Sequence, residues 1–174
     1  PRFEKVTCLT TDRAGALWVG TLGAGLSRFE AGRWKTFTLA DGLPNDNVRV
    51  VVESSDGSFW IGTDGGLAHF ARGVFRRYGI ADGLTNDAIY SVLLDRDGVL
   101  WTSTLGGGIN RFRDGRFQAF TTEQGLFDSV VFQMLDDDSG HLWMSSNRGV
   151  YRAAKADLEV AITHRPRPIP WRLF

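Results

Sequence analysis

The sequence lacks several features that would place it in common protein classes. It has a single cysteine, Cys8, so it cannot form an internal disulfide. Lys and Arg number 20, as do Asp and Glu, which leaves no excess positive charge for nucleic acid or an anionic membrane surface. No apolar run approaches the roughly 18 residues of a membrane span. We therefore expect neither nucleic-acid binding nor direct membrane contact from this segment.

Any targeting signal is also missing from the start of the chain. The sequence opens at Pro1 without Met, and no basic stretch followed by an apolar stretch comes after it. We expect the chain to be a piece of a longer protein that carries such a signal elsewhere.

Glycine and aromatic residues are abundant. The chain holds 21 glycines among 174 residues, against a usual share of roughly 7%. It also holds 12 Phe, 6 Trp and 3 Tyr, and 43% of its residues are hydrophobic. This composition excludes disorder and is typical of short strands joined by tight turns. The sequence therefore predicts an all-β protein.

An internal repeat of about 42 residues organises the chain. Four tryptophans are 42, 41 and 42 residues apart, and each follows a turn signal rich in Asp and Gly: Trp18, Trp60, Trp101 and Trp143. Each is followed by small residues and a glycine at a matched place: Gly25, Gly66, Gly108 and Gly149. A third mark, Asp-Gly-Leu or Gln-Gly-Leu, recurs in the same phase at 41–43, 82–84 and 124–126.

Each repeat reads as four short strands. In the second repeat we expect them at residues 48–53, 59–63, 67–71 and 74–78, with glycine turns between them. A four-stranded antiparallel unit of this length is a β-propeller blade. We expect the tryptophan to pack between neighbouring blades, and the first strand of the second repeat to be buried on both faces. Residues 1–174 then form one partial propeller domain with blades near 5–40, 46–80, 87–122 and 129–174.

The fourth repeat departs from the pattern. Residues 153–162 read as a short amphipathic helix, and residues 165–170 are rich in proline. We treat 153–168 as an insertion in the last blade and expect a delayed outer strand at 171–174. The inner strands should begin near the residue 12 positions before each tryptophan, which is Val131 in the fourth repeat.

Motifs for catalysis, metals or cofactors are weak. Residues 95–98 resemble the start of a calcium loop but lack its downstream acidic ligand, so we interpret them as a turn. We likewise interpret 136–138 as a solvated turn. The Gly-rich stretches 23–25 and 106–108 precede strands, not the helix that a phosphate loop needs. His69 should point outward, His141 should sit in a turn, and with His164 they lack metal-ligand spacing. We expect no cofactor, no metal and no enzymatic activity.

A ligand site is expected where the loops of one face gather. The turns between second and third strands and the connections between blades should share the face around the channel mouth, where propeller ligands bind. Its polar candidates are Asp64, Asn147 and Arg148 from the turns, and Asn45, Asp46, Asn86, Asp87 and Asp128 from the connections. The alternative is that these Asn and Asp residues merely cap turns.

The repeat resembles a known family. Its pattern in the second repeat is Asp-Gly-Leu-Pro-Asn-Asp-Asn-Val at 41–48, then Glu53, Asp56-Gly57, Phe-Trp-Ile-Gly-Thr at 59–63, Gly66-Leu67, Phe75 and Tyr78. This resembles the two-component regulator propeller repeat, over nearly the whole chain. The resemblance implies a fragment of a seven-bladed ring in the periplasmic sensor of a hybrid histidine kinase or diguanylate cyclase, with a connector domain, a membrane helix and an output domain elsewhere.

The resemblance also sets the expected function and partners. It implies a non-catalytic sensor segment that binds a small molecule or saccharide, contacts the remaining blades and connector of its receptor, and takes part in a homodimer. One alternative is a stand-alone secreted propeller acting as a carbohydrate- or protein-binding scaffold. Another is the non-catalytic half of a propeller enzyme.

Overall fold

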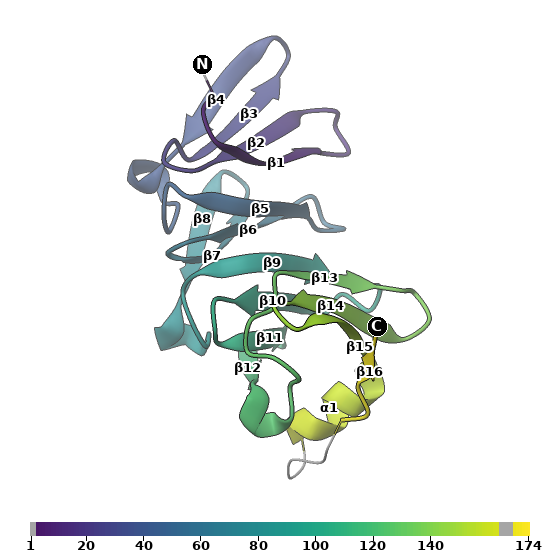
Figure 1. Ribbon diagram of the computed structural model, residues 1–174. Coiled ribbons are helices and arrows are strands. Elements are labelled where there is room, and N and C mark those ends of the chain that lie inside the picture. The colour runs from purple at the N-terminus through teal and green to yellow at the C-terminus, as the bar shows by residue number, and fades with distance from the viewer. Residues whose placement is uncertain (1–2, 164–168) are drawn as a thin grey trace. The chain divides into compact units, whose positions relative to one another are not determined.

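The computed structural model describes residues 3–163 and 169–174, which form four four-stranded sheets (Figure 1). The first blade is β1 (Val6–Thr11), β2 (Leu17–Thr21), β3 (Leu26–Glu30) and β4 (Arg33–Phe37). The second is β5 (Val48–Glu53), β6 (Phe59–Thr63), β7 (Gly66–Ala71) and β8 (Val74–Tyr78). The third is β9 (Ile89–Leu94), β10 (Leu100–Thr104), β11 (Gly108–Arg113) and β12 (Arg116–Phe120). The fourth is β13 (Gln133–Asp136), β14 (His141–Ser146), β15 (Gly149–Ala154) and β16 (Arg172–Leu173).

Helical segments are short and lie outside the sheets. The helix α1 (Lys155–Thr163) separates β15 from β16, and three 3-10 turns follow the first three blades: η1 (Leu39–Asp41), η2 (Ile80–Asp82) and η3 (Thr122–Gln124). Among the described residues, no helix is long and apolar enough to cross a membrane.

The strand order confirms the predicted fold class. Within each sheet the strands pair in chain order, and each pair is antiparallel. The chain separates into two compact units, Pro1–Gly79 with Asp87–Ile89, and Ile80–Asn86 with Tyr90–Phe174. The assignment of residues 1–174 to one partial domain with its blade limits stays a prediction.

Each unit has its own core between two blades. In the first unit, Trp18 of β2 is 1% exposed and packs against Phe59 of the next blade, with ring centres 4.5 Å apart. In the second unit, Trp101 of β10 is 1% exposed and belongs to one cluster with Met134 and Leu142 of the fourth blade. Trp18 and Trp101 therefore each fill the space between the two blades of their own unit, as expected from their size.

Three expectations about the strands need correction. The first strand of the second blade is not buried along its whole length, because only Val48 and Val51 are buried and Arg49, Val50 and Val52 are partly exposed. The fourth inner strand begins at Gln133; Val131 is fully buried but lies before it. The predicted helix begins at Lys155, because residues 153 and 154 still pair with β14. His164 and residues 165–168 lie outside the described residues.

The repeated glycine permits a close backbone approach inside each of the first three blades. Gly25 has a φ of +75°, and a Cβ added there would lie 2.2 Å from the carbonyl oxygen of Phe37 at the end of β4. The counterparts Gly66 and Gly108 face the carbonyl oxygens of Tyr78 and Phe120 in the same way, at 2.7 and 2.4 Å. A side chain at this position would push the outer strand away from the turn.

We expect Gly25→Ala to lower the free energy of unfolding by about 2–3 kcal/mol, because both backbone strain and a clash oppose it. Gly23→Ala is the matched control: its φ of +94° carries strain, but nothing lies within 4 Å of the added Cβ. The free energy of unfolding of this control should fall by only about 1 kcal/mol. Urea unfolding of the two variants measures the difference, and equal losses would argue against the clash.

Candidate functional site

In the first unit, the candidate Asp64 lies in an ion pair at the β6–β7 turn. Its Oδ1 is 2.7 Å from Nε of Arg49, and its Oδ2 is 3.1 Å from Nη2 of Arg49. Asn47 donates a third hydrogen bond, from Nδ2 to Oδ2 at 2.9 Å. The hydrogen bond from Arg49 is the main reason that the pKa of Asp64 is lowered. The group is a partly exposed carboxylate–guanidinium pair, held in two-pronged geometry.

The other candidates of the first unit mainly shape loops. Asn45 Oδ1 accepts a hydrogen bond from the backbone N of Asn47, and Asp46 Oδ1 accepts one from the backbone N of Leu39. The carbonyl of Asp46 also accepts from the amides of Gly23 and Gly25. Asp87 lies against Gly79. The connection at 44–47 thus joins the turns of both blades, as expected for a shared face.

The second unit holds the remaining candidates. Arg148 lies with its guanidinium carbon 4.3 Å from the ring centre of Phe127 and donates from Nη1 to the Phe127 carbonyl at 3.1 Å. Asn86 donates from Nδ2 to the carbonyl of Leu105 at 3.0 Å. Asp128 Oδ1 accepts from the backbone N of Val130, and Asn147 is exposed in the β14–β15 turn.

Two of the three turn candidates are therefore placed beside a connection of their own unit. Asp64 contacts Asn47, and Arg148 contacts Phe127, next to Asp128 in sequence. The role of all eight residues in ligand binding stays a prediction. The side chains of Asn45, Asp46 and Asp128 also accept hydrogen bonds from backbone amides of their own loops, as turn-capping residues do.

Sequence reasoning missed a buried polar link behind the tryptophans. The indole Nε1 of Trp18 donates to Oδ2 of Asp12 at 2.9 Å, and Asp12 Oδ1 accepts from the backbone N of Ala16 at 2.8 Å. Burial alone would raise the pKa of Asp12, but these hydrogen bonds and Arg28 lower it. The same link recurs as Asp95 with Trp101 and Asp137 with Trp143, each at 3.1 Å. The available signal was an Asp six residues before three of the four tryptophans.

The second blade has no aspartate at the position of this link. Ser54 stands where the others have Asp, and His69 lies across the strand pair from Trp60 with ring centres 4.4 Å apart. His69 shares a hydrogen bond with Ser58 Oγ at 2.8 Å and is partly buried, which lowers its pKa. It is therefore packed into the blade, not simply directed outward as predicted.

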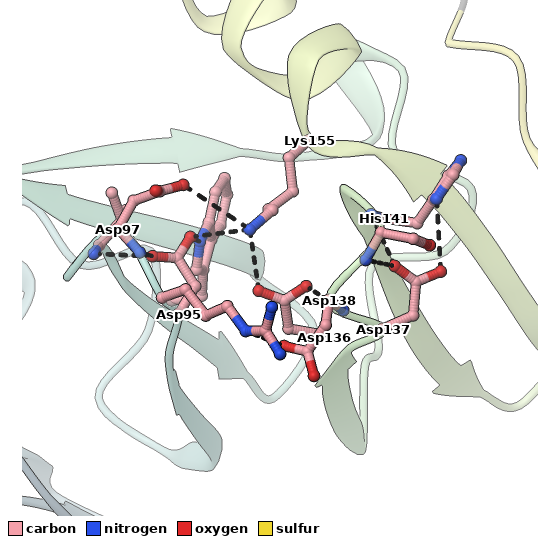
Figure 2. A network of polar contacts seen from close by, with 11 residues as sticks. Asp95, Asp97, Asp136, Asp137, Asp138, His141 and Lys155 are labelled. Atoms are coloured by element: carbon pink, nitrogen blue, oxygen red, sulfur yellow. Dashed lines mark hydrogen bonds and ion pairs between the residues drawn. The ribbon is translucent and has the colours of Figure 1, made fainter.

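A lysine occupies the centre of the acidic turns of the third and fourth blades (Figure 2). Nζ of Lys155, at the start of α1, lies 2.8 Å from Asp136, 3.5 Å from Asp95 and 3.9 Å from Asp97. The side chains of Asp95 and Asp136 are only 3% and 7% exposed. The solvated turn predicted at 136–138 is thus wrong for Asp136, because the helix brings a counter-charge that lets its carboxylate be buried.

Two other chemical expectations can be placed. Residues 95–98 form a turn, with Asp95 Oδ1 accepting from the amides of Asp97 and Val99. His141 does not sit in a turn but begins β14, with Nδ1 3.3 Å from Asp137 Oδ2. Among the residues that the structure describes, no group of three or more His, Cys, Asp or Glu side chains is arranged to hold a metal ion.

Comparison with protein families identifies the repeat. Residues 2–23, 42–65 and 83–106 match the family described as two component regulator propeller. Three of the four repeats thus match the two-component regulator propeller family. The matched segments recur at the spacing of the tryptophans and cover the inner strands of the first three blades, so the two-component regulator propeller repeat and the 42-residue period are the same unit.

Solved structures show the same fold. The extracellular domain of the hybrid two component system BT3049 from B. thetaiotaomicron matches with a TM-score of 0.77 and 22% identity, over 98% of this chain and 23% of that one. The extracellular domain of the one component system BT4673 from the same organism matches with a TM-score of 0.74 and 22% identity, over 87% of this chain and 24% of that one. Virginiamycin B lyase from Staphylococcus aureus matches with a TM-score of 0.71 and 20% identity, over 87% of this chain and 53% of that one.

These structural matches establish architecture but not activity. The chain spans about a quarter of the length of the two extracellular-domain structures. At 20–22% identity the extracellular domains of signalling systems and a lyase all match this fold, so function must be argued from the repeat and its residues. No curated protein matches the chain in sequence.

Proposed function

We propose that this chain is a non-catalytic, ligand-sensing propeller segment from the extracytoplasmic part of a bacterial two-component receptor. The observation that carries the proposal is the match of three in-phase segments to the two-component regulator propeller family. Two similar structures bear the names of extracellular domains of one- and two-component systems, which supports a periplasmic address. The receptor's output domain would be a histidine kinase or a diguanylate cyclase.

The ligand would bind at the loop face. The Arg49–Asp64 pair offers fixed donors and acceptors to the hydroxyl groups of a saccharide or another small polar molecule. In the second unit, Arg148 on Phe127 offers a flat cationic surface. Binding would bias an existing equilibrium between receptor states, so no catalysis by the segment is needed.

Calorimetry with a panel of oligosaccharides and small polar metabolites tests this binding. Asp64→Ala should weaken binding of any ligand found by at least about tenfold, because a charged hydrogen-bonding group is lost. Asp114→Ala is the matched control, since Asp114 is an acidic turn residue with a 92% exposed side chain, at the β11–β12 turn. A panel without any binder would contradict ligand sensing, and equal binding by both variants would contradict the proposed face.

The receptor assignment has its own test. We expect the coding sequence around this segment to encode further propeller repeats, a membrane helix and a kinase or cyclase domain. A coding sequence without membrane helix and output domain would overturn the receptor and favour the secreted scaffold.

A further inference from the structure

A groove opens in the first unit where the first blade meets the second. Its volume is about 690 Å³, within the range of about 300–1,000 Å³ that is usual for small-molecule sites. Residues of β3 and β4 form one wall, and Phe70 and Gly73 of the second blade form the other. The groove is thus formed at a blade boundary inside the unit.

Aromatic rings give this groove an apolar side. Phe37 of β4 is 5% exposed, and its ring centre lies 5.2 Å from that of Phe70 on β7. The ring centre of Phe70 lies in turn 6.1 Å from that of the buried Trp18. These packed rings offer a rigid apolar surface against which the ring or apolar body of a ligand can lie.

Basic residues dominate the charged part of the groove. Three of the four charged residues that line it are cations, Arg28, Arg33 and Lys35. Arg33 and Lys35 lie two positions apart on β4, so their side chains leave the strand on the same side. Nζ of Lys35 lies 4.8 Å from the ring centre of Phe37. The groove therefore places positive charge directly beside its apolar side.

The fourth charged residue of the groove, Glu30, is already paired. It lies opposite Arg33 where β3 pairs with β4. Its carboxylate nevertheless accepts hydrogen bonds from Arg28, at 2.7 Å from Nη1 and at 2.9 Å from Nη2. Within the described parts of the chain, no ion pair joins Arg33 or Lys35 to a carboxylate. These two cations are therefore available to an external anion.

The corresponding boundary of the second unit is filled by the chain itself. There Leu158 of α1 packs in one cluster with Phe120, which stands at the position of Phe37 in its blade. The next residue of the helix, Glu159, forms an ion pair with Arg111 of β11. A carboxylate next to an apolar group thus occupies this boundary in the second unit, which indicates the kind of group that the open groove suits.

We propose that the groove of the first unit binds a small carboxylic acid, whose carboxylate meets Arg33 and Lys35 and whose ring lies against the aromatic side. An acidic sugar and an aromatic acid share this chemistry. The guanidinium of Arg33 can hold both carboxylate oxygens, and the ammonium of Lys35 adds a second charge. The groove borders the β7–β8 turn, whereas Asp64 lies in the turn at the other end of β7. The inference therefore adds a second site to the loop face and does not rest on it.

Calorimetry of the purified chain with two acids and their neutral analogues tests the groove. Trigalacturonate is compared with galactotriose, and phenylacetate with phenylacetamide. At least one acid should bind, and its neutral analogue should bind at least about tenfold more weakly, because the charge-assisted contact is lost. The acid that binds shows whether the ligand is a sugar or an aromatic acid. Absence of binding by both acids, or equal binding by the neutral analogues, would overturn the proposal.

Substitutions at the two cations locate the binding. Arg33→Gln and Lys35→Gln should each weaken binding of the acid by about tenfold, and the third blade already carries Gln118 at the position of Lys35. Arg116→Gln is the matched control, because Arg116 holds the position of Arg33 in the third blade, and it should bind the acid as the parent chain does. Circular dichroism confirms that the variants are folded. Equal binding by all three variants would overturn the proposal. Binding that responds to Asp64→Ala but not to Arg33→Gln would belong to the loop face and would also overturn it.

Discussion

Replacing Trp18 with alanine should lower the free energy of unfolding of the first unit by about 3–5 kcal/mol, the usual cost of removing a buried Trp. The ring is 1% exposed and packs against Phe59 and Phe37 from two different blades. Its loss would open a cavity and also remove the indole donor from Asp12, whose side chain is 4% exposed. Denaturant unfolding followed by circular dichroism measures the change.

Trp34→Ala is the control in the same blade. Trp34 lies on the outer strand β4 and is 37% exposed, and its ring centre is 4.9 Å from that of Phe29 in a tilted arrangement. We expect Trp34→Ala to lower the free energy of unfolding by less than half as much as Trp18→Ala does. The loss of unfolding free energy in Trp18→Phe should lie between those of the two alanine variants, because phenylalanine keeps an aromatic ring but leaves one oxygen of Asp12 without its indole donor. Equal losses for Trp18 and Trp34 would contradict the role of Trp18 between blades.

The fold was predictable because its signals are local and repeated. In the second blade, three strands begin and end at the predicted residues and the third begins one residue earlier, at Gly66. Turn glycines and alternating apolar residues define such strands without reference to distant contacts. Val131 shows the limit of this reasoning: its position in the repeat predicts burial correctly, but burial there does not require strand pairing, and β13 begins later.

The candidate site was less predictable because its contacts join residues that no period relates. The turn that carries Asp64 follows from its glycines, but its partner Arg49 lies among the valines of a strand that the sequence predicts to be buried. Lys155 contacts Asp95 and Asp136 because α1 folds back over two blades, and the insertion occurs in only one repeat. A charge in a unique insertion has no counterpart from which its contacts can be inferred.

Replacing Lys155 with methionine should lower the free energy of unfolding by about 3–5 kcal/mol, because two buried carboxylates would lose their counter-charge. Asp95 and Asp136 both face Nζ of Lys155, and neither side chain is more than 7% exposed. Methionine retains the length and apolar stem of lysine, so the loss reports charge more than packing. Lys35→Met, at an exposed position on β4, is the control and should change stability by less than about 1 kcal/mol.

The pH dependence separates this electrostatic cost from a general loss of structure. Burial disfavours the Lys155 ammonium, but the hydrogen bond to Asp136 and the charges of Asp95, Asp136 and Asp97 outweigh it and raise the pKa of Lys155. The stabilisation is therefore fully present below the ordinary lysine pKa of about 10.4 and is lost as the pH rises through the raised value. The stability difference between Lys155→Met and the parent chain should thus be large at neutral pH and shrink as the pH rises through the raised pKa of Lys155, whereas a purely structural defect would give a difference that does not change with pH. Adding Asp136→Asn to Lys155→Met should restore part of the lost stability, because one of the two uncompensated charges is removed.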